Sequence, residues 1–117
     1  MTMTDLALII DEPWISEILA VRKIWEMRSR PTQIRGRIRL IRKGSGLIVG
    51  EARLYDSKPK LSPDEFARNY LKHRIPFDMS IYEKWPYPWA MDHAVAYDEP
   101  IPYNHPQGAV VWVKIDF

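Results

Sequence analysis

The side chains best suited to chemistry lie between residues 23 and 28, where the chain reads Lys-Ile-Trp-Glu-Met-Arg. The planar guanidinium of Arg28 could hold a phosphate or a base edge through paired hydrogen bonds. Lys23 could act as a point charge or, if desolvated, as a general base. Glu26 could orient Lys23 or accept from an exocyclic amine, as carboxylates do with cytosine. The alternative is a structural ion pair of Glu26 with Arg28, or with Arg35 across the following turn.

This motif opens a strongly basic segment. Residues 22–43 contain nine Lys or Arg and one acid, so the segment carries +8 of a chain whose net charge is +2. Such an asymmetry is typical of a protein that binds an anionic partner at one place. Arg35, Arg37 and Arg39 could follow a phosphate backbone. The alternative is a solvated, charge-protected sheet edge that faces acidic loops of the same protein.

Several aromatic residues could stack on a base, which contributes about 1–3 kcal/mol per base in single-strand binding. Trp14 lies at the start of a predicted helix, whereas Trp25, on a strand, could equally pack against that helix. Trp85, Tyr87 and Trp89 alternate with prolines and could close over a ligand. They could also form a lid that packs on the end of the fold.

The elements that must position these residues are short. The predicted strands cover residues 6–10, 23–28, 37–42, 47–55, 94–97 and 109–115, and the predicted helices cover about 13–21 and 62–74. Gly44 and Gly46 predict a tight turn, and Gly50 predicts a bulge or a close backbone approach. Three prolines argue against a central strand in residues 76–90, where we expect a loop or an edge strand. The pattern predicts one α+β, mainly β domain over residues 1–117, a small β-barrel of about six strands with two helices.

Composition excludes several classes of function. The chain has no cysteine, so disulfides and thiolate zinc sites are excluded, and its three histidines have no helical partner that would favour a metal site. No cofactor is expected, because no Gly-rich phosphate loop or nucleophile elbow occurs. No apolar run approaches about 20 residues, and no signal peptide is apparent, so we expect a cytoplasmic protein that does not enter membranes. The sequence leaves the oligomeric state open.

The order and spacing of short motifs resembles the ASCH domain, a PUA-like family. The matching pieces are Leu8-Ile9-Ile10, Pro13-Trp14, Lys23-x-x-Glu26-x-Arg28, Arg35-Gly36-x-Ile38, Ile48-Val49-Gly50, Trp89, Pro100-Ile101-Pro102-Tyr103, Gly108 and Trp112. The family usually has a small residue, often glycine, two positions before the lysine. Val21 stands there in this chain and is a departure from the pattern.

The resemblance implies a PUA-like β-barrel that binds RNA or a nucleotide in a cleft between the barrel and the first helix. Together with the basic segment, it gives the candidate binding residues Trp14, Lys23, Glu26, Arg28, Arg35, Arg37 and Trp89. One bacterial branch of the family hydrolyses N4-acetylcytidine with a threonine nucleophile three residues after the lysine. Glu26 occupies that position here, and a carboxylate is a poor substitute for an alkoxide in amide attack.

Three functional hypotheses follow. The leading one is an RNA- or nucleotide-binding module. The second is a hydrolase of a modified nucleoside or of RNA, in which Lys23 and Glu26 would form the acid–base pair. The third is a protein-interaction module of a transcription- or translation-linked complex, which would use the aromatic segment 82–89 and residues 97–103.

Overall fold

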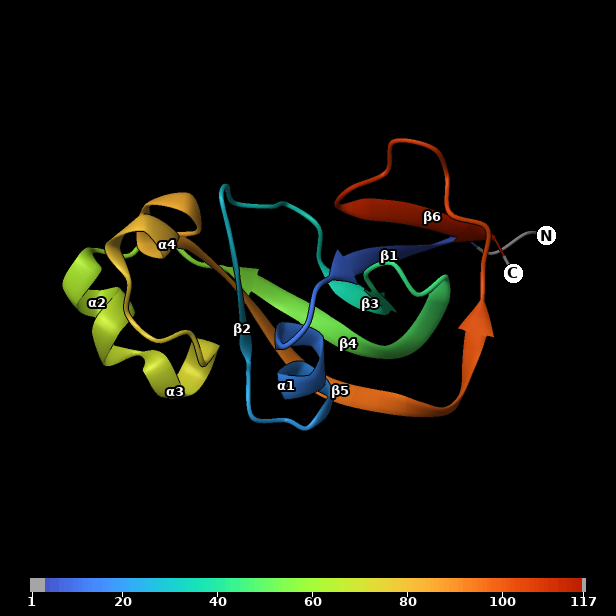
Figure 1. Ribbon diagram of the computed structural model, residues 1–117, viewed down its shortest axis with the longest axis horizontal. Coiled ribbons are helices and arrows are strands. Elements are labelled where there is room, and N and C mark those ends of the chain that lie inside the picture. The colour runs from blue at the N-terminus through green and yellow to red at the C-terminus, as the bar shows by residue number, and fades with distance from the viewer. Residues whose placement is uncertain (1–3, 117) are drawn as a thin grey trace.

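Six strands pair into one mixed sheet in the computed structural model, which describes residues 4–116 (Figure 1). The sheet order is β2-β5-β4-β3-β1-β6, and β1 and β3 are the parallel pair. The elements in chain order are β1 Thr4–Ile10, α1 Trp14–Leu19, β2 Trp25–Arg28, β3 Gly36–Arg42, β4 Leu47–Ser57, α2 Pro63–Arg68, α3 Tyr70–His73, α4 Met79–Lys84, β5 Tyr87–Pro102 and β6 Trp112–Asp116. The predicted α+β, mainly β class is confirmed, and closure of the sheet into a barrel stays a prediction.

The long β5 strand connects the two ends of the molecule. Its residues 87–90 pair with β2, and β4 pairs along its other edge from Trp89 to Pro102. The helices α2, α3 and α4 gather at the end where β5 begins, and both termini lie at the opposite end (Figure 1). The segment that contains Lys23 and β2 therefore lies between the helical end and the larger part of the sheet.

Three buried clusters hold these parts together. The first packs α1 against the sheet and includes Ile15, Ile18, Ile38, Leu40, Leu54 and Met91. The second joins β2 to the helical end through Trp25, Met27, Phe66, Ile75 and Tyr82. The third lies between β1, β3, β4 and β6 and contains Ile9, Ile41, Ile48 and Val113. Within β2 the predicted alternation holds, because Trp25 and Met27 face the helical end.

Both features that the sequence predicts for Gly50, a bulge and a close backbone approach, are present. The β3–β4 register shifts beside it, so the predicted bulge is confirmed. A Cβ atom at Gly50 would lie 2.4 Å from the Val95 carbonyl oxygen and 2.6 Å from Cδ2 of Leu19. The missing side chain therefore lets β5 and the end of α1 approach the β4 backbone closely.

The prediction for residues 76–90 was wrong. Helix α4 lies in this segment and is capped by Asp78, whose side chain accepts from the Ser80 and Ile81 N–H groups. β5 then runs as an inner strand between β2 and β4 despite Pro88. The proline is tolerated because the ladder with β4 ends there, and the Pro88 carbonyl accepts from the Lys58 N–H just beyond β4.

The predicted helix at residues 62–74 is present as two shorter helices. Ser62 forms the expected capping box, since it accepts from the Glu65 N–H while the Glu65 carboxylate accepts from the Ser62 N–H. Asn69 separates α2 from α3. Among residues 4–116, none of the helices has the length and apolarity that crossing a membrane requires.

Candidate functional site

The end of α1 directs the chain toward Lys23. Val21 has φ of +62°, and its N–H donates to the Ile18 carbonyl at 3.0 Å. The Arg22 and Lys23 N–H groups both donate to the Glu17 carbonyl at 3.0 Å. This is a Schellman ending, in which Val21 occupies the left-handed position that glycine usually fills. The turn folds Lys23 back under α1, outside β2, so Lys23 does not share the face of Trp25 as the strand pattern predicted.

Lys23 is one of the largest fully buried side chains among the described residues, with 1% of its surface exposed. Its Nζ donates to the His73 carbonyl oxygen at 2.6 Å and lies 3.7 Å from Oε1 of Glu26. The same Nζ lies 5.3 Å from the ring centroid of Trp14, a cation–π distance. Lys23 therefore ties together α1, α3 and the carboxylate on β2.

Burial lowers the pKa of Lys23 from 10.5 to about 8, although the neighbouring Glu26 carboxylate opposes the shift. The charged form is the one penalised by desolvation. His73 is also buried, and burial lowers its pKa. Its Nε2–H donates to the Phe66 carbonyl and its Nδ1 accepts from the Ile75 N–H, so the ring is held neutral.

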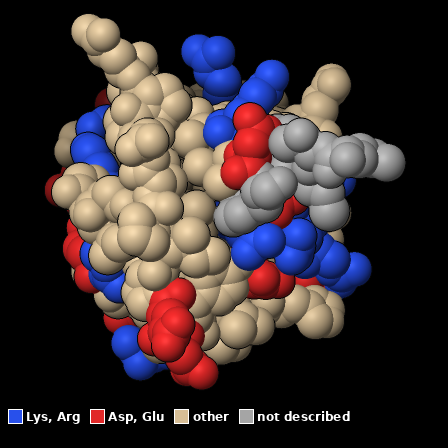
Figure 2. All heavy atoms as spheres, turned by 90° about the vertical axis from the view of Figure 1, so that its right-hand side faces the viewer, with Lys and Arg blue, Asp and Glu red and all other residues tan. Residues whose placement is uncertain are grey.

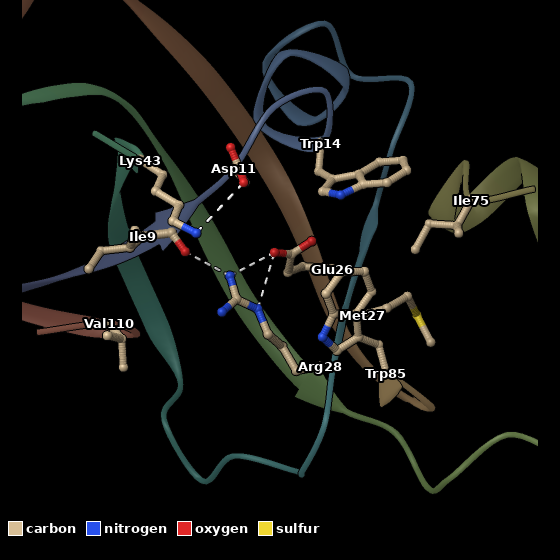
Figure 3. A pocket seen from close by; sticks show the side chains of 10 residues that line it. All are labelled: Ile9, Asp11, Trp14, Glu26, Met27, Arg28, Lys43, Ile75, Trp85 and Val110. Atoms are coloured by element: carbon tan, nitrogen blue, oxygen red, sulfur yellow. Dashed lines mark hydrogen bonds and ion pairs between the residues drawn. The ribbon is translucent and has the colours of Figure 1, made fainter. Parts of the chain in front are cut away.

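A pocket of about 180 Å³ lies in front of Lys23, at the junction of the helical end and the sheet (Figure 3). It is lined by Ile9, Asp11, Trp14, Glu26, Met27, Arg28, Lys43, Ile75, Trp85 and Val110. Three of the predicted site residues, Trp14, Glu26 and Arg28, meet in it. Lys23 contacts two of them from behind but does not line the pocket.

The carboxylate of Glu26 and the guanidinium of Arg28 form its charged floor. Nε and Nη2 of Arg28 donate to Oε2 of Glu26 at 3.1 and 2.7 Å, and Nη2 also donates to the Ile9 carbonyl at 2.8 Å. The structural ion pair expected as an alternative is therefore present between these two residues. Oε1 of Glu26 lies on the side of Trp14, while the remaining Arg28 nitrogen lies on the side of Ile9 and Val110 (Figure 3). That nitrogen, Nη1, forms no hydrogen bond with residues 4–116.

Trp89 lies behind Arg28 and not in the pocket. It is 3% exposed, its Nε1–H donates to the Arg30 carbonyl at 2.9 Å, and its ring stacks on Trp112. The Arg28 guanidinium lies 5.5 Å from the Trp89 ring centroid. Trp89 thus supports the guanidinium, and of the predicted aromatic lid only Trp85 lines the pocket.

Arg35 and Arg37 lie away from this pocket. Nη1 of Arg35 donates to the backbone carbonyls of Thr32 and Ile34. Arg37 forms ion pairs with Asp5 and Glu51 at 3.2 and 3.8 Å. Figure 2 looks onto the end where the termini lie, and basic and acidic groups there lie side by side around a broad uncharged area. The contact of Arg35 and Arg37 with phosphate stays a prediction.

The sequence reasoning missed the opposite rim of the pocket. Nζ of Lys43 lies 3.7 Å from Oδ2 of Asp11 there. The two residues meet because β1 and β3 run parallel, with Ile10 opposite Arg42, so both strands end at the same edge. Lys43 counted toward the basic segment, which was the one available signal. Ile75 and Val110 had no feature in the sequence that marked them as pocket residues. Among residues 4–116, no group of His, Asp or Glu could hold a metal ion.

Comparison with known proteins identifies the family of the chain. The family model of the ASCH domain matches residues 8–107, which is most of the chain and includes the end of β1 and all of α1 and β2. No curated protein sequence matches the chain closely. The family is a PUA-like module generally associated with RNA binding. With the Lys-x-x-Glu-x-Arg segment placed beside α1 and the matched region extending through β5, the chain belongs to the ASCH domain family.

Proposed function

We propose that this ASCH domain binds single-stranded RNA, or a nucleotide derived from it, with one base in the pocket between Trp14 and Glu26. The observation that carries the proposal is the Glu26–Arg28 pair. It holds a carboxylate oxygen toward Trp14 and leaves a guanidinium nitrogen unpaired among the described residues on the other side. One acceptor, one cationic donor and an aromatic ring are therefore presented together.

The acceptor determines which bases fit. Oε1 of Glu26 can accept from the exocyclic amine of cytosine, adenine or guanine. Uracil presents carbonyl oxygens at the corresponding positions and would meet the carboxylate unfavourably. Hydrogen bonds to charged groups contribute about 1.5–3 kcal/mol, so we expect cytidine 5′-monophosphate to bind at least about tenfold more tightly than uridine 5′-monophosphate.

Trp14 would contact the face of the base, and Arg28 would contact the phosphate. The Trp14 ring is partly buried and bounds the pocket above Glu26 (Figure 3), where a base can stack on it. Nη1 of Arg28 would donate to a phosphate oxygen in a charge-assisted bond. The buried Lys23 holds Trp14 and Glu26 in place through its contacts with both side chains. Trp89 holds the Arg28 guanidinium in place in the same way.

Arg35 and Arg37 are proposed as outer phosphate contacts for a longer RNA. Arg37 would have to exchange its exposed pairs with Asp5 and Glu51 for phosphate, which is inexpensive because exposed ion pairs contribute only about 0–1 kcal/mol. Each phosphate neutralised adds about −0.7 to the log–log salt slope of single-strand binding. If these arginines and Arg39 contact about three phosphates, the slope is near −2.

Tryptophan fluorescence titration at low salt tests the proposal. We expect cytidine monophosphate to quench the wild type and expect Arg28→Lys, which keeps the charge but loses the fork, to weaken binding. Glu26→Gln should remove the preference for cytidine over uridine. Glu99→Gln, a change of an exposed carboxylate of β5 outside the pocket, is the matched control. Absence of binding by any nucleotide or short RNA at low salt would reject the function.

The hydrolase hypothesis has one observation in its favour, the lowered pKa of Lys23 beside Glu26. A base of this kind could move a proton only if substrate reached it, and Lys23 is 1% exposed. Incubation with N4-acylcytidine separates the two functions. Turnover that Lys23→Met abolishes would establish the hydrolase, whereas binding without turnover supports the binding module.

A further inference from the structure

A second pocket of about 380 Å³ adjoins the first. The two pockets share Ile9, Lys43 and Val110 as a common wall. The new residues of the second pocket are Gly44, Gly46, Tyr103, His105 and Ala109. The β3–β4 turn and the segment before β6 therefore extend the first pocket into a longer groove.

The first pocket is too small for a whole nucleotide. Pockets for drug-sized ligands measure about 300–1,000 Å³, and the first pocket has about 180 Å³. If a base fills it, the ribose and phosphate must lie at its rim. Nη1 of Arg28 lies on the side of Ile9 and Val110 (Figure 3), which is also the side that leads to the second pocket.

Lys43 lies on the wall between the pockets and is free to take a phosphate. Its partner is Asp11 at 3.7 Å, and both side chains are about two-thirds exposed, at 65% and 63%. An exposed pair of this length holds its lysine only weakly. A phosphate bound between Arg28 and Lys43 would be the one that links a base in the first pocket to the next nucleotide.

The second pocket presents two aromatic rings in a fixed arrangement. The His105 Nε2–H donates to the Ala109 carbonyl at 2.9 Å, which leaves Nδ1 to accept from the Tyr103 hydroxyl at 2.7 Å. The ring centroids lie 5.7 Å apart. The Tyr103 N–H also donates to the Gly46 carbonyl, which ties this segment to the β3–β4 turn. Rings ordered before binding lose less freedom when a base stacks on them.

We propose that the second pocket holds the neighbouring nucleotide of a single-stranded RNA, with its base on Tyr103 and His105 and the connecting phosphate on Lys43. This inference rests on the proposed function and deepens it, because it makes the ligand an oligonucleotide and not a free nucleotide. Stacking of one more base should tighten binding about 5- to 150-fold, the equivalent of about 1–3 kcal/mol per base.

Three probes test the proposal on the full chain: cytidine 5′-monophosphate, the trinucleotide CpCpC, and a trinucleotide with cytosine in the centre and abasic sites on both sides. CpCpC has neighbours on both sides of its central base, so the direction of the strand does not need to be known. The abasic trinucleotide has the same phosphates without the neighbouring bases. We expect CpCpC to bind at least about fivefold more tightly than the abasic probe.

Tyr103→Leu should cancel this gain and leave the affinity for cytidine monophosphate unchanged, because leucine keeps apolar packing against the third cluster. Lys43→Met should weaken both trinucleotides and reduce their salt dependence. Equal binding of CpCpC and the abasic probe, or a gain that survives Tyr103→Leu, would overturn the second pocket while the first stands. Failure of all three probes would remove the proposed function and this inference together.

Discussion

The buried Lys23 should make the stability of this protein depend on pH between about pH 8 and pH 10.5. Its pKa lies near 8 in the folded protein and at 10.5 when exposed. Below pH 8 the lysine is protonated in both the folded and the unfolded state, and burial of its charge costs about 3 kcal/mol, at about 1.4 kcal/mol per pKa unit. That cost is absent above pH 10.5, where the lysine is neutral in both states.

The sign follows from proton binding. Between pH 8 and pH 10.5 the unfolded chain binds more protons than the folded protein, so the free energy of unfolding rises with pH. The two pKa values give a rise of about 2 kcal/mol between pH 7 and pH 9.5. The range from pH 7 to pH 9.5 lies below the pKa of Tyr97 and of Tyr103, which burial raises above 10.

Urea unfolding followed by tryptophan fluorescence and circular dichroism measures this rise. With a slope of about 2 kcal/mol/M, typical of a small domain, the midpoint of the wild type should increase by about 1 M urea between pH 7 and pH 9.5. Lys23→Met, which keeps the length of the side chain without a charge, should show a flat midpoint. Lys114→Met, a change of an exposed lysine in β6, should retain the wild-type increase. A wild-type midpoint that does not rise, or a rise that persists in Lys23→Met, would refute the reasoning.

Three further substitutions test the local structure through thermal and urea unfolding. Val21→Gly should raise the free energy of unfolding by about 0.5–1 kcal/mol. A φ of +62° costs an L-residue about 1–2 kcal/mol, and the larger backbone entropy that glycine loses on folding offsets part of this relief. An unchanged or lower stability would contradict this. Gly50→Ala should lower it by about 3 kcal/mol, since its Cβ would overlap the Val95 carbonyl oxygen, and a neutral effect would show that β4 and β5 separate easily. Ser62→Ala should lower it by about 1 kcal/mol through loss of the bond from the Glu65 N–H, whereas Ser62→Asp, which keeps a capping acceptor, should cost little.

Features specified by neighbouring residues could be predicted from the sequence. The glycine turn at residues 43–46, the capping box at Ser62 and the alternation of Trp25 and Met27 all follow from local rules, and the structure confirms them. Gly50 was singled out because a glycine inside a strand signals close backbone approach, although its neighbours could not be named. The strand through Pro88 was mispredicted because the cost of a proline depends on whether the adjacent strand still pairs there.

Part of the candidate site could also be predicted from the sequence, and part could not. The sequence singled out Trp14, Glu26 and Arg28, and the structure brings these three together in one pocket. The sequence could not show that the Arg37 guanidinium is paired with Asp5 and Glu51, since those partners lie on other strands.

The sequence by itself determined the family, the mainly β class and the three residue types that face the pocket, because these depend on spacing along the chain. The tertiary structure alone decided that Lys23 is buried beneath the pocket, since its acceptor is the His73 carbonyl fifty residues away. It also decided that Lys43 meets Asp11, because β1 and β3 run parallel and end at one edge. Both decisions bring together groups that are distant in sequence, and burial or ion pairing then changes the chemistry that each charge can perform.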